Sequence, residues 1–241
     1  MRFTDPDWQW LDCIEVIEVE GDYEVQTGEV ESLAIVLSGT FDILAGGGSW
    51  MARGVRTSPH DGKPVALFLP PKTRFALHNG RGGLLLVSSR QPEQPSDTTE
   101  ATSEKPLLAL AGSGKAFDPA SGEWKRQEDF PSSPEAILPR RIELTQQGDT
   151  VTRHVAPYDY KALSLTVDEC ILPTDQHITV TAGSIAGYPT ERAVYYDTQG
   201  TLTIGDTSFS GQGVAPAITP GMTIQANGGP AHLVFAGAGP K

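Results

Sequence analysis

The sequence is poor in basic residues and in long apolar runs. Lys and Arg total 18 against 30 Asp and Glu, so the formal net charge is −12. This balance argues against nucleic acid or an anionic membrane as a partner, because both bind basic surfaces. No apolar run approaches the about 18 residues of a membrane-spanning helix. No basic segment followed by an apolar stretch opens the chain, so we expect no secretory signal and a cytoplasmic protein.

Ligand clusters for metals and cofactors are also scarce. The chain has two cysteines, Cys13 and Cys170, and their apolar flanks predict two buried free thiols rather than a disulfide. Its five histidines are scattered singly, without a His-x-His or His-x-x-x-His pair. No Gly-rich phosphate loop, Cys-x-x-Cys or Gly-x-Ser-x-Gly element is present. We therefore predict no metal site and no cofactor.

The dominant pattern is that of short β-strands separated by turn residues. Residues 8–45 predict three strands, residues 65–69 form an apolar strand closed by Pro70-Pro71, and residues 74–77 and 84–88 predict a strand pair. In the C-terminal half, strand patterns cover residues 141–155, 162–172 and 178–180. Residues 193–227 alternate strand patterns with a Gly, a Gly-Asp and a Pro-Gly turn. The sequence predicts an all-β protein.

A polar segment divides the chain. Residues 91–106 have almost no apolar content and predict a solvated linker. Residues 107–138 contain clusters of Gly, Ser and Pro, so we expect irregular structure packed on a barrel. The predicted domains are an N-terminal barrel over residues 1–91, a linker and irregular segment over 92–138, and a C-terminal barrel over 139–241.

The stretch of residues 193–227 resembles the conserved motifs of the cupin superfamily. In the cupin pattern a histidine pair and a glutamate precede a glycine, and a later histidine follows a Pro-x-Gly turn. If Gly200 is that glycine, the glutamate position falls on Ala193, seven residues earlier. The histidine pair falls near Gly187 and Pro189, and the late histidine falls on Ile224.

The same order of signals occurs in the N-terminal half. Ser32 stands seven residues before Gly39, at the glutamate position, and Phe75 stands at the late-histidine position. The resemblance therefore implies a bicupin, two jelly-roll barrels in tandem, in which the usual metal ligands are missing from both copies.

Several ordered segments resemble a narrower group of bicupins, the 5-deoxy-glucuronate isomerases of inositol catabolism and the 5-keto-4-deoxyuronate isomerases. The segments are Leu-Ala-Ile-Val-Leu-Ser-Gly at 33–39, Asp-Gly-Lys-Pro through Leu-Pro-Pro at 61–71, Thr-Val-Thr-Arg-His-Val at 150–155 and Val-Asp-Glu-Cys-Ile-Leu-Pro at 167–173. The resemblance implies a metal in the second barrel on a histidine pair after a Tyr-Pro step. Here Tyr188-Pro189 remains, but no His-x-His follows it.

Candidate site residues follow from the inward direction that the cupin resemblance implies. If Ala193 faces the interior, Tyr195 and Asp197 share its face, because side chains alternate along a strand. Tyr195, Met222 and Ile224 then line the second barrel, with Asp197 near one end and His177 in the same interior. Such a group can transfer protons between adjacent carbons. Alternatively, Tyr195 and Ile224 simply fill the space of the missing metal.

Two further candidates surround this group. His177 and Glu191 are the nearby residues from which a metal site can be rebuilt, and the alternative is a strand residue and a rim charge. Arg153 is a candidate to hold a carboxylate, and the alternative is a surface charge.

Three functions remain open. The first is a metal-free relative of the uronate isomerases that binds a small sugar-acid-like ligand or has a non-catalytic role. The second is an active aldose–ketose isomerase, and the third is a structural bicupin that binds proteins. We expect a small carbohydrate or sugar acid as the ligand, neither nucleic acid nor membrane as a partner, and a homodimer or higher homo-oligomer.

Overall fold

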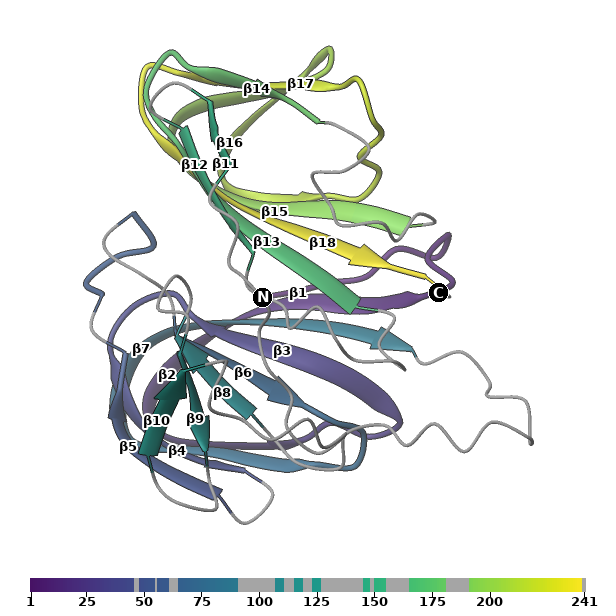
Figure 1. The fold of residues 1–241 in the computed structure, drawn as a ribbon. Coiled ribbons are helices and arrows are strands. Elements are labelled where there is room, and N and C mark those ends of the chain that lie inside the picture. The colour runs from purple at the N-terminus through teal and green to yellow at the C-terminus, as the bar shows by residue number, and fades with distance from the viewer. Residues whose placement is uncertain are drawn as a thin grey trace.

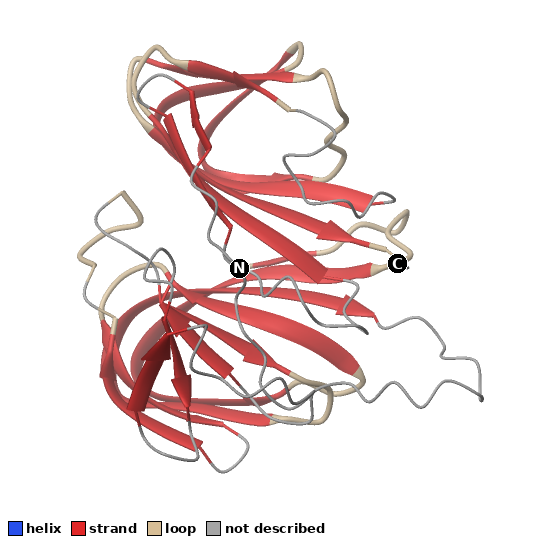
Figure 2. Cartoon of the chain, viewed as in Figure 1, coloured by secondary structure: helices blue, strands red, loops and turns tan. Residues whose placement is uncertain are grey.

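The computed structural model describes residues 1–45, 48–54, 56–60, 65–90, 107–110, 115–118, 123–126, 145–147, 150–154, 165–180 and 191–239. From 107 to 154 it describes the backbone alone. All regular structure in these residues is β-strand, arranged in two sheets that form two lobes (Figures 1 and 2). The all-β prediction is confirmed. None of the described segments forms a helix of the length and hydropathy needed to cross a membrane.

The first sheet contains the described strands of the N-terminal half. They are β1 (Arg2–Phe3), β2 (Leu11–Gln26), β3 (Val30–Val36), β4 (Thr40–Ala45), β5 (Gly48–Arg53), β6 (Val65–Leu69), β7 (Arg74–Arg90), β8 (Leu107–Leu110), β9 (Lys115–Asp118) and β10 (Glu123–Arg126). They pair in the order β1-β2-β7-β3-β6-β8-β9-β10, and β4 joins β7 to β5. The three strands predicted in residues 8–45 correspond to β2, β3 and β4.

Two predictions for this half are wrong. The strand pair predicted at 74–77 and 84–88 is the single strand β7, which pairs with β4 through its first part and with β3 through its second. Glycines at 80, 82 and 83 let the strand bend without ending. The segment 107–126, predicted to be irregular, contains β8 to β10, and β8 pairs with β6 to extend the first sheet past residue 91. The predicted linker at 91–106 lies outside the described residues.

The second sheet contains the described strands of the C-terminal half. They are β11 (Thr145–Gln147), β12 (Thr150–His154), β13 (Leu165–Leu172), β14 (His177–Thr179), β15 (Glu191–Ile204), β16 (Thr207–Ala215), β17 (Thr223–Asn227) and β18 (Ala231–Ala238). Their order is β11-β12-β13-β18-β15-β17-β14, with β16 beside β15. The Gly-Asp turn joins β15 to β16, and the Pro-Gly turn precedes β17 with Gly221 at φ 91°.

Three hydrophobic cores stabilise the structure, one inside each lobe and one between the two lobes. The first lumen core lies inside the N-terminal lobe and includes Ala34, Val36, Phe41, Trp50, Leu67, Phe75 and Leu77. The second lumen core lies inside the C-terminal lobe and includes Cys170, Val194, Tyr196, Leu202, Ile224 and Phe235. The shared core lies between the lobes, where Leu11, Ile14, Val16, Leu33, Ile35, Phe68 and Leu85 meet Leu165, Val167, Ala193, Tyr195, Val234 and Ala236.

The shared core explains the unbroken apolar runs in the sequence. In β6, Ala66 and Phe68 face the shared core, whereas Val65, Leu67 and Leu69 face the first lumen. A strand buried on both faces needs apolar residues at successive positions rather than at alternate ones. Figure 1 shows the same arrangement in space, with β13, β15 and β18 of the upper lobe facing the lower lobe. Cys13 and Cys170 are both buried thiols outside any disulfide, as predicted.

The two scaffold glycines of the cupin pattern occupy equivalent close approaches. A Cβ on Gly39 would lie 1.9 Å from the Arg81 carbonyl oxygen. A Cβ on Gly200 would lie 2.2 Å from the Asn227 carbonyl oxygen. Both positions therefore require glycine, and the repeated spacing detected in the sequence corresponds to a repeated backbone crossing.

Candidate functional site

The interior of the C-terminal lobe contains only part of the predicted site. Ile224 is fully buried in the second lumen core, and Met222 packs against that core. Ile224 pairs with Ile204 and Ile178 on the neighbouring strands. The late-histidine position is thus inside the barrel, as predicted, and is surrounded by aliphatic side chains.

Tyr195 does not share this interior. Val194 and Tyr196 face the second lumen core, whereas Ala193 and Tyr195 face the shared core between the lobes. The prediction that Tyr195 lines the second barrel with Ile224 is wrong by one residue of register, and a one-residue shift moves a side chain to the opposite face of a sheet. Val194, Leu202 and Ile204 all face the second lumen core, so the alternation continues across Gly200 and the inward position is Val194 rather than Ala193.

His177 and Glu191 do not meet in the lumen either. His177 is exposed, and its neighbour Ile178 packs against the second lumen core. The Glu191 carboxylate accepts hydrogen bonds from the backbone N–H groups of three consecutive residues, Gln9, Trp10 (2.8 Å) and Leu11 (2.7 Å). Glu191 therefore holds the N-terminal segment against the C-terminal lobe. His177 and Glu191, the candidates for a rebuilt metal site, are not brought together as ligands.

Asp197 and Arg153 lie on the same sheet. Asp197 is partly exposed, accepts a hydrogen bond from Gln212 Nε2 at 3.4 Å and pairs in register with His232 on β18. Tyr195 and Asp197 share a face, as predicted, but this is the face toward the first lobe. Arg153 pairs in register with Glu169, and its side chain lies outside the described residues.

In the first lumen, the glutamate position (Ser32) and the late-histidine position (Phe75) both have structural roles. Ser32 is buried and its Oγ lies 2.8 Å from Ser88 Oγ, while Phe75 is buried in the first lumen core. The hydroxyl pair satisfies both serines without a ligand, and the aromatic ring fills the remaining space.

The donor set does not match a cupin metal centre. The four family positions in the second barrel are Gly187, Pro189, Ala193 and Ile224, whose side chains carry no donor atom. Residues 181–190 contain no His, Cys, Asp or Glu at all. In the described part of the chain, no three such side chains lie close enough to share an ion. A metal that acts through the usual cupin positions is therefore incompatible with these residues.

The principal polar cluster lies between the lobes. Arg56, in the connection after β5, donates from Nη1 and Nη2 to Oε1 of Glu169 on β13 at 2.6 and 2.7 Å. His232 Nε2 on β18 lies 2.8 Å from the same oxygen. Arg56 also donates to the carbonyl oxygens of Val36 and Pro59, so its guanidinium is fixed in the N-terminal lobe.

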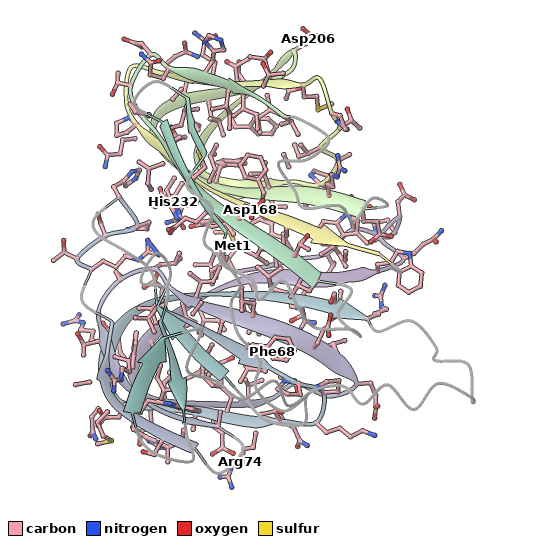
Figure 3. The ribbon with its side chains drawn as sticks, viewed as in Figure 1. Met1, Phe68, Arg74, Asp168, Asp206 and His232 are labelled. Carbon is pink, nitrogen blue, oxygen red and sulfur yellow. The ribbon has the colours of Figure 1, made fainter. Side chains whose placement is uncertain are left out.

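These charges are withdrawn from solvent. Arg56 is 2% exposed, and Glu169 and His232 are 0% exposed. A buried ion pair persists only with close geometry and additional hydrogen bonds, and all of these are present here. Figure 3 shows His232 on the side of the upper lobe that faces the lower lobe. The rings of His60 and Tyr195 flank that of His232, with centroids at 6.3 and 6.2 Å.

The sequence interpretation missed this cluster. Its members are 113 and 63 residues apart in the chain, so no local motif connects them. One signal was available: Asp168-Glu169 interrupts the apolar strand 165–172, and carboxylates in such a strand are rarely buried without partners.

Burial acts strongly on the phenol of Tyr195. Desolvation raises the pKa of this group, and the negative charges of Asp197 and Glu18 raise it further. The phenol therefore keeps its proton and is available as a hydrogen-bond donor. Tyr195 thus lies in an acid–base cluster with His232, Glu169 and Asp197, although outside the lumen where it was predicted.

Comparisons with known proteins agree with the predicted relationship. The model of the KduI/IolB family matches residues 13–116. No match was found among proteins of curated function. Three solved structures show the range of fold similarity.

An IolB-like protein from Salmonella typhimurium LT2 is 15% identical, with a TM-score of 0.69, over 100% of this chain and 89% of that chain. YhhW from Escherichia coli is 17% identical, with a TM-score of 0.52, over 96% and 82%. An oxalate decarboxylase from Lactobacillus farciminis, solved as a formate complex, is 12% identical, with a TM-score of 0.54, over 98% and 79%. The predicted resemblance is confirmed: residues 13–116 match the model of the KduI/IolB family, and the chain has the all-β fold of the IolB-like protein.

Proposed function

We propose that this chain is a metal-free relative of the sugar-acid isomerases that binds a small sugar acid. The KduI/IolB match relates the chain to 5-keto-4-deoxyuronate and 5-deoxy-glucuronate isomerases. The observation that carries the metal-free part is the chemistry of the second lumen, where the late-histidine position is the fully buried Ile224. The described side chains of this lumen form no cluster that could hold a cation, and it is a bound cation that would polarise a carbonyl.

The expected ligand is therefore a sugar acid, as for the related isomerases, but no metal ion takes part in binding it. A sugar acid offers several hydroxyl groups and one carboxylate. The described cluster between the lobes offers partners for hydroxyl groups, whereas its one buried guanidinium, that of Arg56, is held by Glu169.

The test combines metal analysis with an activity assay. Full-length protein is incubated with Mn²⁺, Fe²⁺, Ni²⁺ or Zn²⁺ and passed through a desalting column. We expect less than about one metal ion per ten chains, because a site without ligands does not retain an ion. We also expect no conversion of 5-deoxy-glucuronate or 5-keto-4-deoxyuronate, but a raised melting temperature with D-glucuronate, since a ligand specific for the folded state stabilises it. One retained metal per chain together with isomerase turnover would contradict the proposal.

An isomerase without a metal is the second candidate. The contact between Glu169 and His232, with the buried Tyr195 beside it, favours it, because a phenol whose pKa is raised by burial often marks an acid–base site. The same assay separates the two: turnover that survives chelation and is lost in Tyr195→Phe supports the metal-free enzyme.

A further inference from the structure

Two polar atoms are buried in the shared core without a hydrogen-bond partner among the described residues. They are the phenol oxygen of Tyr195 and Nδ1 of His232, and both residues are 0% exposed. Buried polar atoms in native proteins almost always have a partner, which is a protein group, a water molecule or a ligand. An unpartnered pair at one place therefore indicates a group that completes it.

The two side chains lie close together on one face of the second sheet. Tyr195 pairs with Val234, and Asp197 pairs with His232, so Tyr195 and His232 are diagonal neighbours on adjacent strands. Their ring centroids are 6.2 Å apart and their planes are inclined at 70°. Diagonal neighbours of this kind lie within reach of each other when the side chains are long.

The surrounding contacts define what each atom offers. Arg56 holds Glu169 as a carboxylate, so the bond between Glu169 Oε1 and His232 Nε2 is one in which His232 donates. In a neutral imidazole the other nitrogen, Nδ1, is then an acceptor. Tyr195 offers a donor, because burial and the neighbouring carboxylates of Asp197 and Glu18 keep its phenol protonated.

The complement of one donor and one acceptor is a hydroxyl group. We propose that the shared core binds a hydroxyl group between Tyr195 Oη and His232 Nδ1, supplied by a polyol ligand such as a sugar acid or by a single water molecule. The nearby negative charges of Asp197 and Glu18 disfavour a carboxylate at this position, so the ligand presents a neutral hydroxyl here. Asp197, which pairs with His232 on the same face of the sheet, is partly exposed.

Where the hydroxyl belongs to a sugar acid, this inference rests on the proposed function and locates its ligand. The location differs from the second lumen, which Val194 and Tyr196 face from the opposite side of β15.

The test uses two neighbouring tyrosines of the full-length chain. Tyr195→Phe removes the hydroxyl and keeps the ring, and Tyr196→Phe is the matched control on the opposite face of the same strand. Melting temperatures are measured without additive and with D-glucuronate, D-glucose or acetate at about 10 mM, because stabilisation depends on ligand concentration relative to its Kd. D-Glucose tests hydroxyl groups without a carboxylate, and acetate tests a carboxylate without hydroxyl groups.

For a bound polyol we expect D-glucuronate to stabilise the wild type and Tyr196→Phe but not Tyr195→Phe, and acetate to stabilise none of them. Stabilisation by D-glucose but not by D-glucuronate keeps the hydroxyl site and rejects the sugar acid. For a bound water we expect no additive effect and a lower melting temperature for Tyr195→Phe than for the wild type.

Two results overturn the inference. One is a D-glucuronate response that persists in Tyr195→Phe, which leaves sugar-acid binding intact but moves it elsewhere. The other is a Tyr195→Phe variant at least as stable as the wild type when no additive has any effect.

Discussion

Replacing Arg56 with methionine tests whether the buried ion pair holds the two lobes together. Arg56 donates hydrogen bonds to the carbonyl oxygens of Val36 (2.9 Å) and Pro59 (3.1 Å) and from two nitrogens to Glu169 (2.6 and 2.7 Å). Methionine keeps an unbranched apolar side chain of the length of the arginine stem and removes the guanidinium. It leaves the Glu169 carboxylate buried beside His232 without the guanidinium that neutralises it.

The expected loss is large because the removed charge leaves its partner in a low-dielectric environment. Breaking a buried pair by removing one member costs about 3–5 kcal/mol. In a chain of this size each kcal/mol lowers the melting temperature by about 2–4 °C, so we expect a decrease of roughly 6–20 °C. The double variant Arg56→Met/Glu169→Met removes both charges, so it should recover about 1–3 kcal/mol relative to the sum of the two single variants.

Urea unfolding at pH 7, followed by circular dichroism, measures these differences as midpoints at constant slope. The control is Arg74→Met, which removes an ion pair with Glu24 on the exposed face of the N-terminal lobe and should leave the midpoint unchanged. A loss below about 1 kcal/mol for Arg56→Met would refute the reasoning, as would strict additivity in the double variant.

Three further perturbations follow from the described contacts. Glu191→Ala removes the acceptor of three backbone N–H groups and should cost about 2–3 kcal/mol in urea unfolding, with a smaller loss for Glu191→Gln; equal stability of Glu191→Ala and wild type would contradict the anchoring role. Gly39→Ala should yield little soluble protein on expression, because its Cβ would overlap the Arg81 carbonyl. The control Gly28→Ala, where φ is 66° and the space is open, should lower the free energy of unfolding by about 1 kcal/mol. Similar yields of the two variants would contradict the close approach at Gly39. The pKa of Tyr195 is raised above its ordinary value of 10.0, so the phenol ionises first in the unfolded chain, and stability should fall above pH 10 by up to about 1.4 kcal/mol per pH unit. Urea midpoints measured from pH 9 to 11 should therefore fall less steeply for Tyr195→Phe than for the wild type. Equal slopes would show that the phenol is not buried as described.

The sequence was informative wherever structure follows from local pattern. Strand patterns located β2, β3 and β4, and an unbroken apolar run located β6. The spacing to Gly39 and Gly200 identified two positions where a second backbone segment passes too close for a Cβ. Such features depend on a few neighbouring residues, so a linear pattern records them.

What the sequence did not reveal depends on register and on distant contacts. The face on which Tyr195 lies was inferred by placing the cupin glutamate position at Ala193, but its neighbour Val194 is the residue that faces the second lumen core. Glu169 and His232 meet on adjacent strands of the second sheet, and Arg56 reaches them only because the two lobes are apposed. Glu191 looked like a rim charge or a ligand, and its three backbone partners come from the other end of the chain.

The shared core has a consequence for how such a protein can evolve. Once the outer surface of each repeat became the inner surface of the pair, the two halves stopped being free to change separately. A substitution at Leu33 or at Val234 must satisfy both repeats at once. Loss of either half would expose the apolar face of the remaining lobe and promote aggregation, so selection retains the duplication even when the chemistry of one barrel is no longer needed.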